Sequence, residues 1–316
     1  MKRINGRILK IEMNSKIVRA HLSLFVACSL WGLMSPVGKA AMEAGVSSLS
    51  LASFRIMGGA VCFWIASIFA PKEKVSRRDL LLLFFAGLLC VAFTQGLFIV
   101  GLSLTSPIDS TVITTSLPII TMILAALFLK EPITSVKVAG VALGATGALI
   151  LVLSNHGGSE KAGNIWGDIL CFVAQISFAC YLTIFKGLIS RYNIFTLMKW
   201  MFVYASICYV PFTYQSLSDT LNQSFPITVW LQIGYVIVFG TFTASMLILV
   251  GQKTLRPTVV SMYNYMQPIV GAGVAVLIGM GTFGWAKALA SALIFTGVYV
   301  VTKSKSREQI QREKNK

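Results

Sequence analysis

Charged residues are scarce in this sequence. Only 12% of its 316 residues are charged, whereas 56% are hydrophobic, and the mean hydropathy is +0.77. A soluble globular domain carries about 25% charged residues, so this composition excludes an ordinary soluble protein. The net charge of +16 suggests nucleic-acid binding. However, the basic residues stand at the ends of apolar runs instead of forming one basic face, which excludes that function.

Residues that bind metals or catalyse reactions are scarce as well. The chain has 11 acidic residues and 2 histidines, and none of them is expected at mid-membrane. The cysteines lie inside apolar runs, without CxxC or Cys/His spacing, and are expected to be buried thiols without disulfides. They are Cys28, Cys62, Cys90, Cys171, Cys180 and Cys208. The sequence therefore predicts no catalytic residue, no metal site, no cofactor and no proton coupling through a buried acid.

Long apolar runs account for most of the chain. A membrane-spanning helix needs roughly 20 apolar residues, and runs of about this length predict ten helices. The expected spans are 19–39, 48–70, 79–103, 107–129, 134–153, 166–186, 195–214, 229–251, 257–279 and 283–301. The runs lack the two-residue alternation of a membrane β-barrel. We therefore predict an all-α integral membrane protein with ten transmembrane helices.

The basic residues predict the orientation of these helices, because Lys and Arg are retained on the cytoplasmic side. With 1–18 and 304–316 as cytoplasmic tails, 23 of the 27 basic residues lie in or beside inner loops. The other four are Lys39, Arg55, Lys161 and Lys287. We expect a multi-pass protein of the cell (inner) membrane with both termini in the cytoplasm. Translation is expected to start at Met1 or at Met13.

The two halves of the chain repeat one another. Glycines and prolines match at an offset of 150 residues, and an aromatic pair nearer the start of each half matches at 147. The matches are Gly101 with Gly251, Pro107 with Pro257, Pro118 with Pro268, Gly147 with Gly297, and Trp31 with Phe178. The polar segment 154–165 is an expected external linker between repeats 19–153 and 166–303. Because five helices per repeat is an odd number, the second repeat must be inverted, an architecture typical of alternating-access transporters.

Short motifs in both halves form a recognisable set: Trp31-Gly32, Arg55, Pro118, Leu129-Lys130-Glu131-Pro132, Gly140, Gly147, Gly167-Asp168 and Pro268. On these motifs the chain resembles the drug/metabolite transporter superfamily, EamA type, over residues 20–303. The chain departs from the family at Gly279-Met280-Gly281, where a Gly-Glu signature is often repeated. The resemblance implies a ten-helix transporter that exports neutral or amphipathic solutes, such as amino acids and related metabolites or drug-like compounds.

Two prolines mark the expected substrate site. Pro118 and Pro268 remove a backbone donor inside a helix and free a carbonyl at mid-span. Such broken helices often line a substrate cavity, and a static kink is the alternative. Polar residues beside these prolines, with Ser261 among them, share their helix faces. Those expected to contact substrate are Thr111, Thr114, Thr115, Asn264, Tyr265 and Gln267. The alternative is helix-to-helix hydrogen bonding, in which a threonine bonds to its own backbone, and it applies above all to the threonines.

Aromatic rings and amides on other helices complete the expected substrate-binding set. They are Trp31, Thr94, Gln95, Gln175, Phe178 and Tyr181. Rings cover the apolar surface of an amphipathic solute, while amides fix its orientation. Packing between helices is the alternative for each ring.

Three ionisable residues have expected structural roles. Arg55 lies a third of the way into its helix, too deep to reach water easily, and is expected to bind backbone carbonyls, with anion binding as the alternative. Asp109 lies in the first turn of a helix and is expected to stabilise it. Glu131 is expected to form a salt bridge at the membrane surface beside Lys130.

Secondary transport is the function that these features favour. A membrane enzyme would need clustered His, Asp, Glu or Cys near a surface, and a partner-binding membrane protein has no reason to keep symmetric polar faces. A membrane enzyme and a partner-binding membrane protein, neither of which transports a solute, are the two alternatives. The expected partners are a small-molecule substrate and the lipid bilayer, and no nucleic acid. The glycine stripe of Gly140, Gly144 and Gly147 is expected to pack within one chain, so we expect a monomer, with a homodimer as the alternative.

A cysteine at position 159 tests this topology. In a background without the native cysteines, Ser159→Cys should react with an impermeant thiol reagent on intact cells, because the 154–165 linker is expected outside. Reaction only after lysis would mean that both the orientation and the number of spans are wrong.

Overall fold

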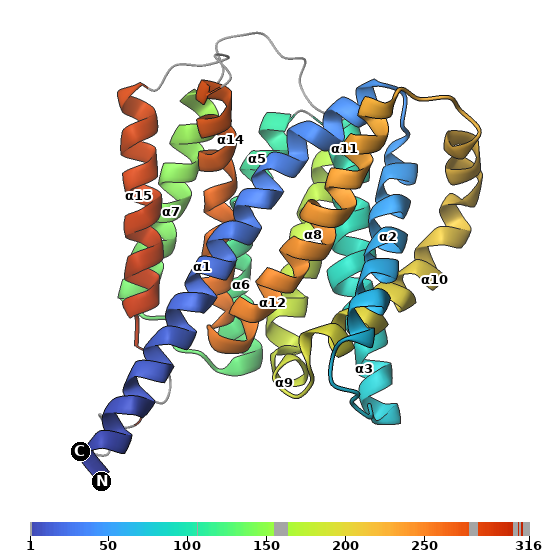
Figure 1. Ribbon diagram of the computed structural model, residues 1–316. Coiled ribbons are helices and arrows are strands. Elements are labelled where there is room, and N and C mark those ends of the chain that lie inside the picture. Colours follow the sequence, from blue (N-terminus) through green and yellow to red (C-terminus); the bar gives the residue numbers. More distant parts are fainter. Residues whose placement is uncertain are drawn as a thin grey trace.

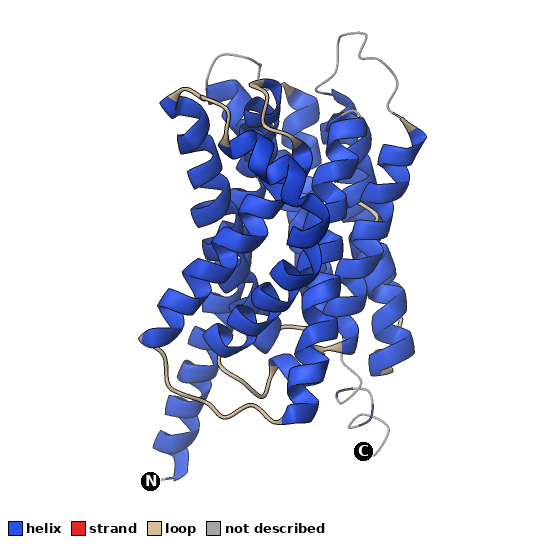
Figure 2. Cartoon of the chain, turned by 90° about the vertical axis from the view of Figure 1, so that its right-hand side faces the viewer, coloured by secondary structure: helices blue, strands red, loops and turns tan. Residues whose placement is uncertain are grey.

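The computed structural model describes residues 2–105, 107–154, 164–277 and 284–305, together with 309 and 311. Side chains are described for all of these except 2–14, 35, 107–109, 111, 151–152, 154, 272 and 275–277. Throughout these ranges the chain forms helices joined by loops and turns, without any β-strand (Figure 2). The prediction of an all-α protein is therefore confirmed.

The first half of the chain begins with a long helix and contains one π-helix. Its elements are α1 (Lys2–Glu43), α2 (Ser48–Ile68), α3 (Arg77–Gly87), η1 (Leu88–Leu97), α4 (Phe98–Leu104), α5 (Pro107–Thr114), α6 (Leu117–Leu129) and α7 (Ser135–Ser154). The π-helix η1 has hydrogen bonds that span five residues instead of four. It joins α3 and α4 into one continuous helical segment.

The second half repeats this order of elements. Its elements are α8 (Ile165–Ile184), α9 (Lys186–Ile189), α10 (Ile194–Leu221), α11 (Ile227–Ile237), η2 (Val238–Thr243), α12 (Ala244–Thr254), α13 (Pro257–Met262), η3 (Tyr263–Tyr265), α14 (Met266–Leu277) and α15 (Trp285–Lys303). The element η2 is a second π-helix and η3 is a 3₁₀ turn. The starts of α11, η2, α13 and α15 follow those of α3, η1, α5 and α7 by 150 residues.

Eight helices in the described ranges are long and apolar enough to cross a membrane, and they run side by side between the two ends of the molecule (Figure 1). They are Ser15–Glu43, Ser48–Ile68, Arg77–Leu104, Val112–Leu129, Ile165–Ile184, Ile194–Leu221, Ile227–Thr254 and Trp285–Lys303. Each coincides with a span expected from the sequence. The apolar part of α7, Ser135–Ile150, is shorter, and the expected span 257–279 is interrupted between α13 and α14. The count of ten therefore stays a prediction.

Polar side chains determine where several helices begin. Ser47, Ser76 and Asn193 precede α2, α3 and α10, and their side-chain oxygens accept first-turn N–H groups at 3.1, 3.1 and 3.0 Å. Such N–H groups have no partner within their own helix. Asp79 in the first turn of α3 also accepts a hydrogen bond of 2.7 Å from the Tyr192 hydroxyl. This bond ties the start of α3 to the loop that precedes α10.

Helices of the two halves pack against each other in matching pairs. The helix α2 lies along α10, α1 lies along α12, and α8 lies along η1 and α4. A Cβ atom at Gly101 would lie 2.7 Å from Sγ of Cys171, and a Cβ atom at Gly251 would overlap with the side chain of Leu24. Gly251 follows Gly101 by 150 residues, and Cys171 follows Leu24 by 147. The two contacts are therefore equivalent under the repeat.

Small residues allow α7 and α15 to approach closely. A Cβ atom at Gly297 would lie 2.6 Å from the carbonyl oxygen of Gly140, and one at Gly147 would lie 2.7 Å from that of Ala290. A Cβ atom at Gly144 would lie 2.6 Å from the ring of Tyr265. The expected packing of the glycine stripe within one chain is therefore confirmed.

The connection between α6 and α7 contains a buried ion pair. Lys130 has a φ of 54°, a left-handed conformation that ends α6. The carboxylate of the next residue, Glu131, lies 2.9 Å from Nζ of Lys137, whose side chain is only 1% exposed. Glu131 thus forms the salt bridge expected from the sequence. Its partner comes from α7 and lies inside the protein, because the left-handed turn directs the chain back toward the bundle.

Substituting Gly297 tests the α7–α15 contact. In Gly297→Ala the new methyl group has no room beside the backbone of Gly140 and Gly144, and overpacking of this kind costs about 1 to 3 kcal/mol. The matched control is Gly234→Ala in α11, where a Cβ atom meets nothing within 4 Å. Thermal unfolding of the purified protein should show a lower melting temperature for Gly297→Ala and no decrease for Gly234→Ala. Equal melting temperatures would contradict the close approach of these helices.

Candidate functional site

Two helix breaks stand at equivalent places in the two halves. Between α5 and α6 the helix is interrupted at Thr115 and Ser116, and between α13 and α14 it tightens into η3. Pro118 and Pro268 follow these breaks and have no N–H group to continue the helical hydrogen bonding. At the first break, the N–H groups of Thr115 and Ser116 bond to carbonyls three residues back, each at 3.0 Å.

The two breaks contact one another. The hydroxyl of Tyr265, at the end of η3, donates a hydrogen bond of 3.1 Å to the carbonyl oxygen of Thr115. Tyr265 follows Thr115 by 150 residues, so the two residues occupy equivalent positions. Equivalent residues that touch each other lie beside the axis that relates the halves. Tyr265 is itself buried, and this contact occupies its hydroxyl.

A second contact between equivalent residues involves two aromatic rings. The ring of Trp31 in α1 meets the ring of Phe178 in α8 edge to face, with 5.9 Å between the centroids. These positions match at the 147-residue offset. The indole N–H of Trp31 donates to the carbonyl oxygen of Gly240 in η2 at 2.9 Å. Trp31 is half-buried and Phe178 is buried, so the pair is held by packing and by the backbone of the π-helix.

The aromatic and polar side chains of α8 differ in their contacts. The Phe178 and Tyr181 rings stack with 6.1 Å between centroids, and the Tyr181 hydroxyl donates to Oε1 of Gln252 at 3.0 Å. The carbonyl of Gln252 in turn accepts from Nζ of Lys186. Tyr181 therefore belongs to a structural network between α8, α9 and α12. Gln175 is buried three residues before Phe178, on the same face of α8.

Thr94 and Gln95 lie in the π-helix η1. The Thr94 hydroxyl donates to the carbonyl of Leu89 at 2.6 Å, and the carbonyl of Ala174 in α8 lies 3.5 Å from it. Gln95 is buried, and its Oε1 atom has no hydrogen-bond partner within the described part of the chain. Such atoms are rare in proteins because each costs desolvation energy. Gln95 thus offers a free acceptor beside α8.

One residue near Gln95 was missed by the sequence reasoning. Tyr209 of α10 places its ring against Gly96, because a Cβ atom at that glycine would lie 2.5 Å from Cε2 of the tyrosine. The Tyr209 hydroxyl is buried and also has no hydrogen-bond partner in the described ranges. No repeat match or helix break marks Tyr209 in the sequence. Only its packing against the π-helix brings it to Gly96, the residue that follows Gln95.

The amides of the second break bond to each other. Nε2 of Gln267 donates to Oδ1 of Asn264 at 2.7 Å, and Nδ2 of Asn264 donates to the carbonyl of Ser261 at 3.1 Å. A Cβ atom at Gly32 would lie 2.7 Å from the carbonyl oxygen of Gln267. The turn of Trp31-Gly32 therefore packs directly on this break, and Gln267, which is half-buried, is the more accessible amide.

The threonines of the first break differ from one another in burial. The hydroxyl of Thr115 is buried and donates to the carbonyl of Val112 at 2.6 Å, the local bonding that was weighed as the alternative. Thr114 is half-buried. The side chains of Thr111 and Asp109 lie outside the described residues, as does most of the 154–165 linker.

Arg55 is buried between α2 and the second π-helix. Its side chain is 3% exposed, and its Nε atom donates to the hydroxyl of Thr241 in η2 at 3.1 Å. The described partner is thus a side-chain hydroxyl and not the backbone carbonyl expected from the sequence. The hydroxyl of Thr241 donates in turn to the carbonyl of Val236 at 2.8 Å. A guanidinium at this depth is held by the π-helix, whose hydroxyl the sequence pattern did not indicate.

Comparison with known proteins places these features in a family. The model of the EamA-like transporter family matches the chain twice, over residues 18–153 and 165–303. A solved crystal structure has the same fold, with a TM-score of 0.72 at 18% sequence identity, and the match covers 90% of this chain and 96% of the other.

Curated relatives carry transporter names. An uncharacterized transporter of Archaeoglobus fulgidus is 28% identical over 230 residues, which cover 72% of this chain and 76% of the relative. The uncharacterized inner membrane transporter YedA of Escherichia coli is 23% identical over 294 residues, 90% of each chain. The uncharacterized transporter YyaM of Bacillus subtilis is 22% identical over 271 residues, 83% of this chain and 89% of the relative.

Substituting Thr241 tests the anchoring of Arg55. Thr241→Val removes the hydroxyl and leaves the buried guanidinium without its described partner, and hydrogen bonds to charged groups contribute about 1.5 to 3 kcal/mol. Thermal unfolding should therefore show a clearly lower melting temperature. The control is Thr228→Val at the exposed start of α11, which should change little. If the two variants melt together, the π-helix does not anchor Arg55.

Proposed function

Since the chain belongs to the EamA-like transporter family, we propose that it is a secondary transporter that exports small neutral or amphipathic metabolites, such as amino acids, by alternating access. The observation that carries this proposal is the contact between the two helix breaks, Tyr265 to Thr115. It joins equivalent residues of two repeats at interrupted helices, the arrangement in which transporters bind substrate.

The proposed architecture is ten spans in two inverted repeats. Eight apolar helices and the 150-residue spacing of element starts support it. In Figure 1 the spanning part of α1 runs from the lower to the upper end, whereas its counterpart α8 begins at the upper end. Opposite directions of equivalent helices are the property that defines an inverted repeat.

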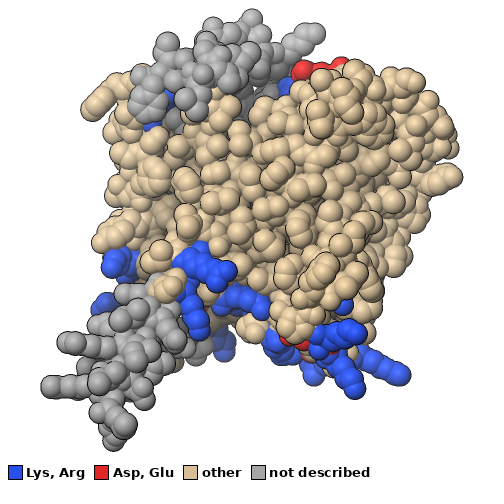
Figure 3. All heavy atoms as spheres, viewed as in Figure 1, with Lys and Arg blue, Asp and Glu red and all other residues tan. Residues whose placement is uncertain are grey.

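The proposed orientation has both termini in the cytoplasm. In the view of Figure 3, Lys and Arg gather at the lower end of the molecule, where α1 begins and α15 ends in Figure 1, and the middle of that face shows none. Basic residues are retained on the cytoplasmic side. The lower end in these figures is therefore the proposed cytoplasmic side.

The proposed substrate site lies between the two breaks, against Trp31 and Phe178. Asn264 and Gln267 contribute polar contacts, and the free Oε1 atom of Gln95 adds an acceptor. Two of the expected aromatic hydroxyls, those of Tyr181 and Tyr265, already bond within the protein, so their rings contribute shape more than polarity. Selectivity would then depend on the size of the solute and on a few amide groups.

Alternating access is proposed to use the irregular segments of both halves. Breaks and π-turns interrupt regular helical bonding in α5–α6, α13–α14, η1 and η2, and chain segments of this kind absorb changes in helix direction. Because they occur in equivalent pairs, a movement that opens one end has a counterpart that closes the other. A monomer is proposed, since α15 already covers the glycine stripe of α7.

Substituting Trp31 tests the site. With the solute identified by metabolite profiling of cells with and without the protein, Trp31→Ala should weaken its binding in liposome counterflow assays. A stacked ring contributes about 0.5 to 1.5 kcal/mol beyond its buried area. The control is Phe295→Ala, an exposed ring on α15, which should bind like the parent. Asn264→Leu should affect polar solutes more than apolar ones.

Trp31→Phe separates binding from folding. It keeps a ring against Phe178 but removes the N–H group that bonds to Gly240. If the ring at position 31 faces the substrate, Trp31→Phe should lower the melting temperature, because the bond to Gly240 is lost. Its affinity for the solute should stay nearly normal, because a ring is kept. All variants must first reach the membrane at parental abundance. If Trp31→Ala and Asn264→Leu then transport like the parent, the substrate site lies elsewhere.

A further inference from the structure

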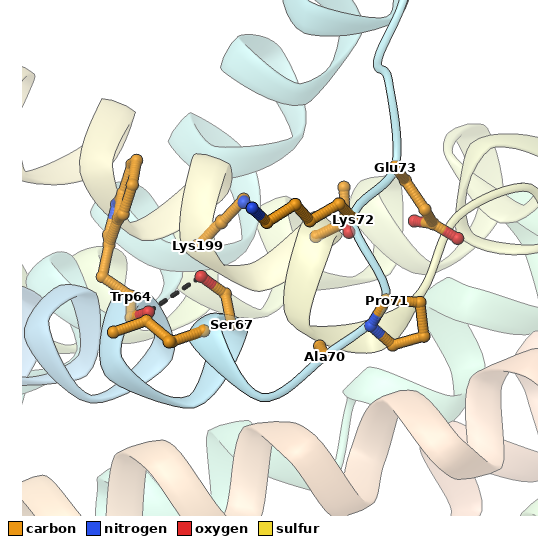
Figure 4. Close-up of a pocket in the computed structure, with 9 residues that line it drawn as sticks. Trp64, Ser67, Ala70, Pro71, Lys72, Glu73 and Lys199 are labelled. Carbon is orange, nitrogen blue, oxygen red and sulfur yellow. Dashed lines mark hydrogen bonds between the residues drawn. The ribbon is translucent and has the colours of Figure 1, made fainter.

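A pocket of about 440 Å³ lies where α2 ends and α10 begins (Figure 4). This volume falls within the roughly 300 to 1,000 Å³ of small-ligand sites. The pocket shares no residue with the proposed substrate site. Its lining residues combine an aromatic ring, aliphatic side chains and two lysines, and those used below are Trp64, Ile68, Lys72, Glu73 and Lys199.

Two ammonium groups face this pocket. In Figure 4 the side chains of Lys72 and Lys199 extend across the same space. In the described part of the chain, the ion pairs are Glu131–Lys137 and Asp79–Arg191, and neither involves these lysines. The nearby Glu73 accepts the backbone N–H of Asn193 at 2.7 Å. Two like charges at one pocket repel each other, so the site favours an anion between them.

An aromatic wall holds one of the lysines in place. Nζ of Lys199 lies 5.2 Å from the centroid of the Trp64 ring, a cation–π contact. The Trp64 ring packs edge to face on Trp200, with 6.0 Å between centroids. Tryptophan is enriched where a membrane meets water. The pocket thus holds a positive charge against a ring of the kind that is enriched at lipid headgroups.

An apolar stripe leads along α2 to the pocket. Met57, Val61, Trp64, Ile65 and Ile68 are exposed at helical spacing, and Trp64 and Ile68 are 44% and 73% exposed. On a membrane protein such a face contacts acyl chains. The stripe ends at Phe69, which is 86% exposed, directly before the basic segment that starts at Lys72.

We propose that this pocket binds the phosphodiester of an anionic phospholipid, with Lys72 and Lys199 at the phosphate and the acyl chains along the exposed face of α2. A diacyl lipid would contact both the two lysines and the exposed apolar face of α2, whereas free phosphate would contact only the lysines. The site requires membrane embedding and does not depend on transport, so it stands or fails independently of the proposed function.

Lipid-dependent stability of the full chain tests this site. Phosphatidylglycerol added to protein in phosphatidylcholine nanodiscs should raise the melting temperature, and native mass spectrometry should detect retained phosphatidylglycerol. Lys72→Gln and Lys199→Gln should each lower the relative affinity for phosphatidylglycerol about fivefold, the change that corresponds to about 1 kcal/mol per basic residue at an anionic membrane surface. Lys199→Arg should retain the preference, because it keeps the charge over Trp64.

Two matched lysines serve as controls. Lys74→Gln removes a charge two residues from Lys72, and Lys303→Gln removes a lysine with the same kind of ring contact, 5.6 Å from the centroid of Tyr299. Neither residue lines the pocket, so both variants should keep the preference. Equal losses in all four glutamine variants would indicate general charge attraction and overturn the site. Equal stabilisation by inorganic phosphate at the same concentration would overturn the lipid assignment. Melting in phosphatidylcholine alone verifies that each variant is folded.

Discussion

Backbone groups inside a bilayer have no water to bond with, and the structure of this protein depends on that constraint. Breaks and π-turns alter the regular bonding of a helix, so their backbone groups need other partners. The two halves supply these partners to each other. The Tyr265 hydroxyl bonds to the carbonyl of Thr115, and the indole of Trp31 bonds to the carbonyl of Gly240. The first break and the second π-helix thus each accept a hydrogen bond from a side chain of the opposite repeat.

We propose that the candidate site lies on the axis between the repeats, because contacts there join equivalent residues. A residue that bonds to its own counterpart is brought to the centre, together with its neighbours on the helix. Most polar groups there are satisfied locally, such as the amides of Asn264 and Gln267. The buried atoms without a partner in the described ranges include Oε1 of Gln95 and the hydroxyls of Thr121, Tyr209 and Thr258, and we propose the first of these as an acceptor for a bound solute.

Buried charged side chains also need partners inside the protein. A cation in the bilayer interior is costly unless it is paired or reaches water, and Arg55 meets this cost through Thr241. Lys137, buried near the start of α7, is paired with Glu131. At the ends of α2 and α10, Lys72 and Lys199 take part in neither of the described ion pairs, and anionic lipid is the partner proposed for them.

Apolar length and repeat spacing are properties of the chain itself, so the sequence alone was enough to predict the helical membrane fold, the equivalence of the two halves and the α7–α15 glycine contact. No sequence pattern predicts the π-helices, because their five-residue hydrogen bonding depends on how neighbouring helices pack against them. The sequence also did not determine which side chains contact one another. Arg55 meets Thr241, and Tyr209 packs on Gly96, only after segments far apart in sequence have packed. Whether Tyr181 and Tyr265 keep free hydroxyls was decided in the same way, because burial and partner choice belong to the assembled helices.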